Sequence, residues 1–447
     1  MTDSTILAHG LGGARDLPIS LTLAVLAGIW VLVISFVVLI FAWRHRRFTA
    51  DTGRVAPEPI RTVVDSPAWA WLWRVFGLLG FGYCLLACLA GKDLGTNPIF
   101  GITYVWLWVG VPLASLFFGP VWKAISPIRT LHLLLSRAAG IDPATGIRDY
   151  PTRLGYWPAA VGLYAFVWME LVSPFPTMLG PLTVWLGAYT AIMLVGSAVY
   201  GERFLSHGDP FEVYSTLVSR LSVWGRDVAG TLVLRNPLAN LDTVRAAPGL
   251  VAVVSVLFGS TIYDSFGESA TWLSFSQDND FVRDHPSAPD VINNLGLIGF
   301  ILAVAGIFMA AAMLTGIGPE RRRRDLPAEF ANSIVPIIVG YIFAHYLTYL
   351  VLQGQNTLIL VSDPLGTGAD WFGTADYQIN YWLAQHPTLL AVIKVSAVII
   401  GHVIGVITAH ERSLTVLPKQ HQVVGQLPLL FAMLFFTGTG IYLLFAT

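Results

Sequence analysis

Long apolar stretches alternate with shorter polar ones along the chain, a pattern that predicts an all-α, polytopic transmembrane helix bundle. A helix needs about 20 mostly apolar residues to cross the hydrocarbon core of a bilayer. Read in windows of about 19 residues, the sequence contains ten such stretches, at 18–43, 69–90, 102–121, 156–173, 178–200, 249–266, 294–316, 329–352, 387–409 and 425–445. The stretch 156–173 is the weakest, and only the Ser173-Pro174-Phe175-Pro176 break separates it from the next. If these two formed one re-entrant pair, the number of spans would fall to eight.

Composition agrees with this pattern and narrows the class of protein. Of the 447 residues, 55% are hydrophobic and 12% are charged, whereas a soluble domain carries about 25% charged residues. The apolar excess must face lipid, so the bilayer is the first expected partner. A formal net charge of −1 without a basic domain gives no sign of a nucleic-acid partner. We expect one membrane domain over residues 1–447.

The distribution of charge predicts how the chain is oriented. Basic clusters follow the first span at Arg44-His45-Arg46-Arg47 and the seventh at Arg321 to Arg324, and such clusters stay in the cytoplasm. With both termini outside, all Lys and Arg residues fall on inward segments except Arg15, Lys92, Arg283 and Lys394. The outward loops 267–293 and 353–386 are acidic instead. The first span, which lacks a preceding basic region, is expected to be an N-out anchor and not a cleaved signal.

The inward loop 201–248 contains a helix-start pattern at Asp209-Pro210-Phe211-Glu212, with an N-cap Asp, Pro at the first helical position and Glu as the second half of a capping box. Apolar residues then recur at helical spacing. We predict an amphipathic helix that lies on the inner membrane surface. The alternative is a helix that packs against the inner loops.

Polar residues within the spans are the candidates for function, because a charge at mid-bilayer costs roughly 2.5–3.5 kcal/mol to insert. Tyr341, His345, Thr348 and Tyr349 have the spacing of one helix face. That face must turn toward protein or water, and His345 is expected about 12 Å from the outer end of its span. The stripe can be a ligand or proton pathway, or simply a hydrogen-bonded packing surface.

Four further positions join this set. Lys394 shares a face with Gly401 and Gly405, whose spacing marks close helix packing, so it is predicted to point inward and to need an acidic partner. Asp264, which follows Ser260 and Thr261, or Glu170 could supply that partner; snorkelling of Lys394 and placement of Glu170 at the outer interface are the alternatives. His402 lies roughly 10 Å deeper than His345, which argues against a bis-histidine haem.

We predict no cofactor. Cys84 and Cys88, which lie one helical turn apart, are weak candidates for a copper site with His9 as the third ligand. A structural role as buried thiols is commoner for such cysteines. The aspartates of 353–386 do not follow the EF-hand calcium spacing. The sequence also lacks the GxSxG, HExxH, P-loop and GxGxxG motifs of soluble enzymes.

Several stretches resemble a group of actinobacterial multispan membrane proteins that are sometimes labelled fenitrothion hydrolases. The stretches are AHGLGG followed by DLP, GDPFEVYSTLVSRLSVWGR, SDPLGTGADWFGTAD and GHVIGVITAHER, and the resemblance covers most of the chain. It implies a bacterial plasma membrane location, and the label implies hydrolysis of organophosphate esters.

Three functions are consistent with these patterns. The first is a permease for an ion or small solute, with a polar site between spans six, eight and nine formed by Asp264, His345 and Lys394. The second is a membrane-embedded metalloenzyme, either the hydrolase or a copper-linked redox protein. The third is a non-catalytic subunit that contacts other membrane proteins of an envelope complex. We expect the permease.

Overall fold

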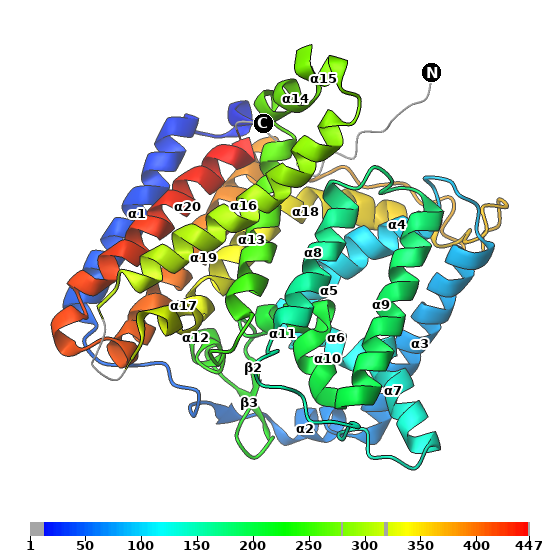
Figure 1. Ribbon diagram of the computed structural model, residues 1–447, viewed down its shortest axis with the longest axis horizontal. Coiled ribbons are helices and arrows are strands. Elements are labelled where there is room, and N and C mark those ends of the chain that lie inside the picture. The colour runs from blue at the N-terminus through cyan, green and yellow to red at the C-terminus, as the bar shows by residue number, and fades with distance from the viewer. Residues whose placement is uncertain (1–12, 279, 317–320, 446–447) are drawn as a thin grey trace.

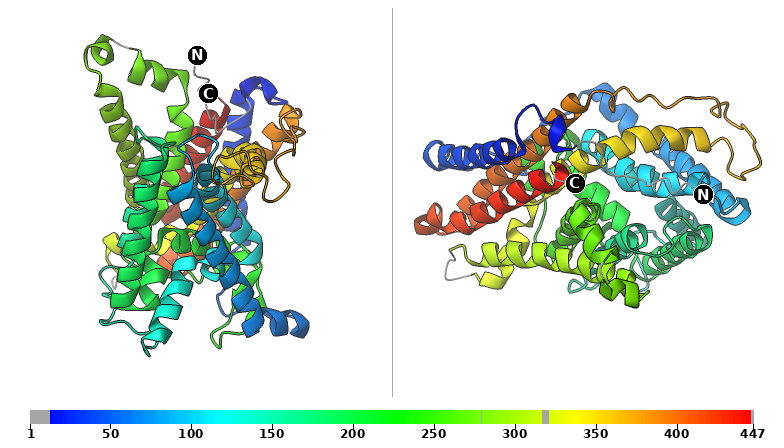
Figure 2. Two further views of the ribbon diagram at one scale, coloured as in Figure 1. Left: turned by 90° about the vertical axis from the view of Figure 1, so that its right-hand side faces the viewer. Right: turned by 90° about the horizontal axis from the view of Figure 1, so that it is seen from above.

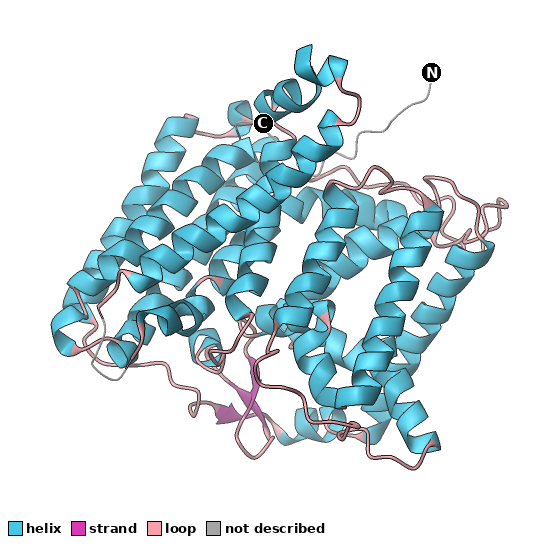
Figure 3. Ribbon diagram, viewed as in Figure 1, coloured by secondary structure: helices cyan, strands magenta, loops and turns pink. Residues whose placement is uncertain are grey.

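A computed structural model describes residues 13–278, 280–316 and 321–445 and has the predicted architecture, a bundle of helices with very little strand (Figures 1 and 3). Nine helical segments in the described part of the chain are long and apolar enough to cross a bilayer. They are Leu21–Ala42 (α1), Pro67–Ala90 (α3), the continuous run of Pro98–Gly101 (α4), Ile102–Gly110 (η2, a π-helix) and Val111–Phe118 (α5), Leu179–Tyr200 (α9), Leu250–Gly267 (α13), Ala288–Met313 (α16), Val335–Leu360 (α18), Pro387–Val416 (α19), and Val424–Gln426 (η6) with Leu427–Phe445 (α20). The protein is therefore a multi-pass membrane protein.

The one predicted span not among these nine, 156–173, corresponds to helix α8, Trp157–Leu171. Its 15 residues rise only about 22 Å, which is less than the hydrocarbon thickness of about 30 Å. Residues 172–178 separate it from α9, so the two are distinct helices. Helix α1 begins and α20 ends at the same end of the bundle, where α14 and the loop between α18 and α19 also lie (Figure 1).

The remaining elements are short. The other α-helices are Glu58–Val64 (α2), Val121–Ile125 (α6), Pro127–Ala138 (α7), Glu202–Gly208 (α10), Pro210–Ser219 (α11), Pro237–Leu241 (α12), Ala270–Gln277 (α14), Asp280–Asp284 (α15) and Leu326–Phe330 (α17). The 3-10 turns, besides η6, are Ala14–Asp16 (η1), Arg323–Asp325 (η3), Ala331–Ser333 (η4) and Lys419–His421 (η5). Three strands, Arg54–Val55 (β1), Trp224–Arg226 (β2) and Leu232–Leu234 (β3), form an antiparallel sheet in the order β1-β3-β2.

Helix α18 is longer than the sequence pattern predicted, because it continues through the polar residues that were expected to begin a loop. The amide of Gln355 donates to the Val351 carbonyl at 2.7 Å, and the hydroxyl of Thr357 donates to the Gln353 carbonyl at 2.7 Å. These bonds satisfy the polar groups on the helix itself. His345 therefore lies about 22 Å along the axis from the end of the helix, not the predicted 12 Å. Seen from two further directions, α18 is strongly inclined to its neighbours (Figure 2).

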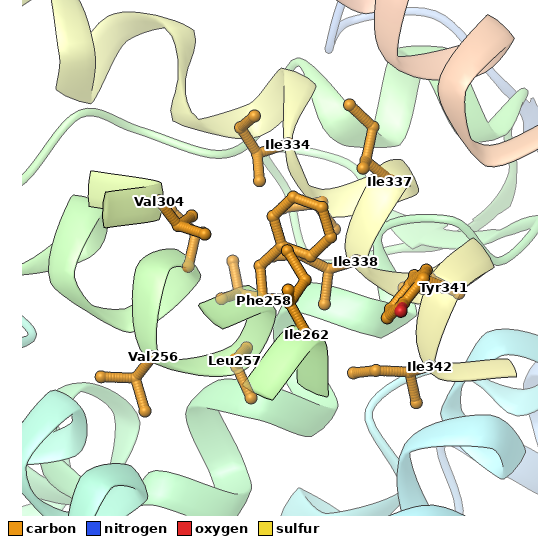
Figure 4. Packing of buried hydrophobic residues seen from close by; sticks show 14 of the residues in the cluster. Val256, Leu257, Phe258, Ile262, Val304, Ile334, Ile337, Ile338, Tyr341 and Ile342 are labelled. Carbon is orange, nitrogen blue, oxygen red and sulfur yellow. The ribbon is translucent and has the colours of Figure 1, made fainter. Parts of the chain in front are cut away.

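The core of the protein lies where α13 meets α18. Helix α13 is buried along most of its length, and its residues Phe258 and Ile262 pack with Ile338 of α18 (Figure 4). Phe258 also meets the ring of Phe436 in α20 at a centroid distance of 5.1 Å. These contacts fix the relative positions of the two helices that carry most of the polar residues discussed below.

Helices α18 and α19 approach until their backbones touch. A Cβ atom added to Gly340 would lie 2.5 Å from the Ala397 carbonyl oxygen, and one added to Gly401 would lie 2.5 Å from the Pro336 carbonyl oxygen. Gly405 is similarly enclosed, at 2.8 Å from the Ser333 carbonyl oxygen. Only glycine fits such a contact. The close packing predicted from Gly401 and Gly405 is confirmed, and we call it the glycine seam.

Helix α11 does not lie on the membrane surface as predicted. Nine of its ten residues are buried, and it packs against α5, α6 and α8 inside the protein, which is closer to the packed alternative. The Asp209 cap is confirmed, since its side chain accepts from the N–H groups of Phe211 and Glu212. The capping box is absent because the Glu212 carboxylate binds Arg129 of α7 instead, at 2.7 and 3.1 Å.

Candidate functional site

Polar side chains from α13 and α18 meet inside the bundle and form a continuous hydrogen-bonded series. The Nε2 atom of His345 lies 2.9 Å from Asp264 Oδ2, and its Nδ1 atom lies 3.0 Å from Ser265 Oγ. Tyr346 donates its hydroxyl to the same Asp264 oxygen at 2.7 Å. Tyr341 donates to Ser265 Oγ at 2.9 Å. We call these five residues the buried polar chain.

The buried polar chain is shielded from solvent and from lipid. Ser265 is 2% exposed, His345 is 3% exposed and Asp264 is 6% exposed. The ring of Tyr341 lies parallel to the imidazole at 6.4 Å, and Tyr346 meets it edge-on at 4.6 Å. Two aromatic rings thus hold the imidazole between its two hydrogen-bonding partners, so the geometry is fixed by packing as well as by polar contacts.

The hydrogen bonds around His345 are compatible with two charge states. With a neutral imidazole protonated on Nε2, the ring donates to Asp264 while the Ser265 hydroxyl donates to Nδ1. With a cationic imidazole both ring nitrogens donate, and the Ser265 hydroxyl can turn to the Thr261 carbonyl oxygen, 3.2 Å away. Rotation of the Ser265 hydroxyl therefore allows the Asp264–His345 pair to accept or release a proton without leaving a hydrogen-bond donor or acceptor unsatisfied.

Sequence reasoning identified Asp264, His345 and Tyr341 but missed Ser265 and Tyr346. Both follow directly after a predicted site residue, yet on a helix the next residue is turned by about 100° and was assigned to another face. Thr348 and Tyr349 of the predicted stripe are buried beside these residues. Knowledge of which helices are neighbours was needed to find the two missing partners.

Glu170 of α8 approaches the same region, and its carboxyl is enclosed by protein, whereas placement at the outer interface, the alternative given above, would expose it to water. Both carboxyl oxygens are buried, and the residue lies one turn after Phe166 on a buried helix face. The Phe166 ring contacts Trp108 of η2 at 4.8 Å and Tyr104 at 6.0 Å. Trp108 in turn interacts with the Tyr346 side chain. The π-helix thus places Tyr104 and Trp108 against the face of α8 that carries Phe166.

Lys394 is buried, as predicted. Glu268, which follows α13, and Asp16 of η1 are acidic groups whose charges act on it. His402, further along α19, is also buried. Its Nδ1 atom lies 2.8 Å from the Val398 carbonyl oxygen, and its Nε2 atom has no hydrogen-bond partner. These two residues are thus not among the groups that bond to His345.

A second polar network lies at the end of the bundle that carries the basic clusters, and its ion pairs link separate segments of the chain to one another. Asp242 pairs with Arg46 at 2.6 Å and approaches Arg412 of α19 at 3.8 Å, and Arg412 also pairs with Glu329 of α17. A cavity of about 10 Å³, room for a single water, lies between Asp242, Arg412 and Glu411. The network connects α19 to the segments that follow α1 and α12.

Within the described part of the chain, the weak metal candidates gain no further ligand from the fold. Cys84 and Cys88 are half-buried free thiols on α3, and His9 lies outside the described residues. Among the described residues, no three or more His, Cys, Asp or Glu side chains gather in a way that could hold a metal ion.

The aspartates of the loop between α18 and α19 shape turns. Burial raises the pKa of Asp363, but hydrogen bonds from the N–H groups of Thr367 and Gly368 and from the Thr367 hydroxyl together outweigh this effect and leave the pKa lowered. The Ser362 hydroxyl and the N–H groups of Ala375 and Thr374 lower the pKa of Asp370. Both carboxylates are engaged with their own loop, which is typical of Asx turns.

Comparison with known proteins yields no match for this chain among family models, curated proteins or solved structures.

Proposed function

We propose that the protein is a proton-coupled permease of the bacterial plasma membrane that moves a small ion or solute. The observation that carries this proposal is the buried Asp264–His345 pair, in which both ring nitrogens have partners. Histidine is the side chain best suited to gain and lose a proton near neutral pH. Ionisable residues inside membrane bundles commonly belong to such relays.

Charge balance supports the same role. An ionised Asp264 beside a neutral imidazole leaves one buried negative charge, whereas uptake of one proton makes the pair neutral overall. In a medium of low dielectric constant this difference is large. Binding and release of a proton would therefore change the electrostatic energy of the α13–α18 contact, and this change could be coupled to the movement of a solute.

The test uses purified protein in liposomes that contain the pH-sensitive dye pyranine. Ammonium, phosphate, acetate and glycine are added outside in turn, and proton movement is recorded. We expect at least one of these probes to drive proton movement with the wild-type protein, and Asp264→Asn to abolish it. Ser255→Ala is the matched control, because Ser255 is buried in the same helix with no hydrogen-bond partner for its hydroxyl. Traces that equal those of protein-free liposomes for all four probes would contradict the proposal.

A second candidate function is metal-free ester hydrolysis, favoured by the order Ser265–His345–Asp264. A serine, a histidine and a carboxylate in hydrogen-bonded series form the nucleophilic apparatus of many hydrolases. In such a reaction Ser265 Oγ would attack the ester phosphorus while its proton passes to His345 Nδ1, and the ester P–O bond would break so that the alcohol leaves with that proton. Water would then hydrolyse the phosphoryl-serine and regenerate the Ser265 hydroxyl. Ester hydrolysis is also what the hydrolase label implies.

A fluorophosphonate probe separates the two functions. A hydrolytic Ser265 would attack the probe, release fluoride and become phosphonylated, and Ser265→Ala would remove the label. We expect no labelling of the native protein at this position, because Ser265 is buried and already bonded to Tyr341 and His345. Stoichiometric modification of Ser265, detected by mass spectrometry, would instead establish the hydrolase.

A further inference from the structure

Helix α7 has one face packed on the protein and a second face that is exposed yet partly apolar. It lies beside α3 and α9, at the end of the bundle opposite to α14 (Figure 1). Ile128 is buried in a cluster with Met193 of α9. On the exposed face Leu134 and Leu135 are 39% and 61% exposed, and Arg137 follows them. The core of the protein therefore does not account for the apolar side chains of this helix.

The chain after α7 extends the same surface to the end of α9. The N–H groups of Ile147 and Arg148 donate to the carbonyl oxygens of Ala198 and Val199, at 3.4 and 2.8 Å. Carbonyl groups in the last turn of a helix have no partner within that helix, so this segment satisfies the end of α9. The side chain of Ile147 is 80% exposed and that of Ile141 is 55% exposed.

A lipid-facing stripe on α9 runs directly into this surface. Exposed residues recur along α9 at intervals of three or four, at Val184, Ala188, Ala191, Val195 and Ala198. The 22 residues of α9 rise about 33 Å, enough to cross the hydrocarbon core. The end of α9 therefore lies close to the boundary between the acyl chains and the headgroups. Because Ala198 accepts the hydrogen bond from Ile147, the exposed isoleucine lies at this boundary as well.

The charges of the same stretch are mainly positive and directed outward. Between residues 123 and 153 the exposed cations are Lys123, Arg137, Arg148 and Arg153, and the exposed carboxylates are Asp142 and Asp149. Asp142 accepts a hydrogen bond from the N–H of Ala144 at 2.9 Å. Arg129 does not contribute to this charge, because it is turned inward and pairs with Glu212. Four outward cations against two carboxylates favour an anionic partner.

We propose that the exposed face of α7, together with segment 141–148, binds anionic phospholipids in the leaflet at the basic end of the bundle. Leu135, Ile141 and Ile147 would reach the edge of the acyl chains, while Arg137 and Arg148 would contact the phosphate groups. Apolar side chains beside Lys and Arg are typical of helices that lie in this interface, and each cation near it attracts anionic lipid. The inference does not depend on the proposed transport function.

Spin labels test the depth of this surface. In a variant with both native cysteines replaced by serine, nitroxides are attached at Leu135→Cys or Ile147→Cys, and the protein is placed in vesicles of phosphatidylcholine and phosphatidylglycerol. We expect both labels to collide more with oxygen than with a nickel chelate, as a label at the lipid-facing Val195→Cys should. Val228→Cys, at a fully exposed position between β2 and β3, is the control for water. The pattern of Val228 at either position would overturn the proposal.

Brominated lipids test the preference for anionic headgroups. A bimane fluorophore at Ile147→Cys is recorded in equimolar phosphatidylglycerol and phosphatidylcholine, with one of the two lipids brominated at a time. We expect brominated phosphatidylglycerol to quench at least about twofold more strongly. Replacing both arginines, in Arg137→Gln with Arg148→Gln, should make the two lipids equal, whereas Arg54→Gln, which removes an exposed cation of β1, should not. Equal quenching in the native protein, or a preference that survives loss of both arginines, would contradict the inference.

Discussion

His345→Gln is expected to lower solute-driven proton movement by at least about 100-fold, the contribution that a positioned proton-transfer group typically makes. A glutamine amide can replace the hydrogen bond from His345 Nε2 to Asp264, which is 2.9 Å long in the native protein. It cannot, however, accept and release a proton near neutral pH. The variant should therefore fold normally and lose function. Pyranine fluorescence in proteoliposomes measures the loss, and the thermal unfolding midpoint in detergent reports on folding.

His402→Gln provides the control for this prediction. His402 is equally buried and donates from Nδ1 to the Val398 carbonyl oxygen of its own helix, α19, so its replacement should leave proton movement close to the wild-type rate. Wild-type activity in His345→Gln would show that the proton does not pass through this imidazole. A similar loss in both variants would indicate a general effect of changing a buried histidine.

Arg129→Met is expected to reduce the free energy of unfolding by about 3–5 kcal/mol, the usual cost of removing one partner of a buried ion pair. Arg129 binds both oxygens of Glu212, whose side chain is 2% exposed, and also pairs with Glu202 at 3.0 Å. The variant would leave the Glu212 charge uncompensated beneath α11. Denaturant-induced unfolding in detergent, followed by tryptophan fluorescence, measures the change.

Two comparisons make this second prediction specific. Arg226→Met removes a partner from the Arg226–Asp65 pair, which is roughly half exposed on both sides, and should cost no more than about 1 kcal/mol. Adding Glu212→Gln to Arg129→Met should recover part of the lost stability, because no uncompensated charge then remains. An Arg129→Met variant as stable as the wild-type protein would mean that the Glu212 carboxyl is neutral in the native state.

The fold was largely predictable because lipid allows few solutions for the backbone. Apolar stretches of the required length fix where helices lie, and the prolines at Pro174 and Pro176 mark a true break. Boundaries were less predictable: α18 continues past Gln353 because polar side chains there bond to their own helix. The buried position of α11 inside the protein was also not predicted, because apolar periodicity does not reveal whether the apolar face of a helix meets lipid or protein.

The candidate site was predictable only in part. The cost of burying Asp264 and His345 pointed to both residues, and the structure places them in contact. The partner of Lys394 could not be derived, because depth along a helix says nothing about which helices are neighbours. Trp108 and Tyr346 could not be identified from the sequence as part of the site. An aromatic residue in an apolar span looks like an ordinary packing residue until the structure shows that its polar atom has a partner.

The glycine seam limits how anything can reach Asp264 and His345. Where two main chains touch, as at Gly340 and Gly401, there is no width for even a methyl group, and hence none for a hydrated ion or an acyl tail. A proton or solute that reaches Asp264 and His345 must therefore approach from a side other than the α18–α19 contact. In any opening motion α18 and α19 must therefore move together as one rigid unit, and the other helices shift relative to them.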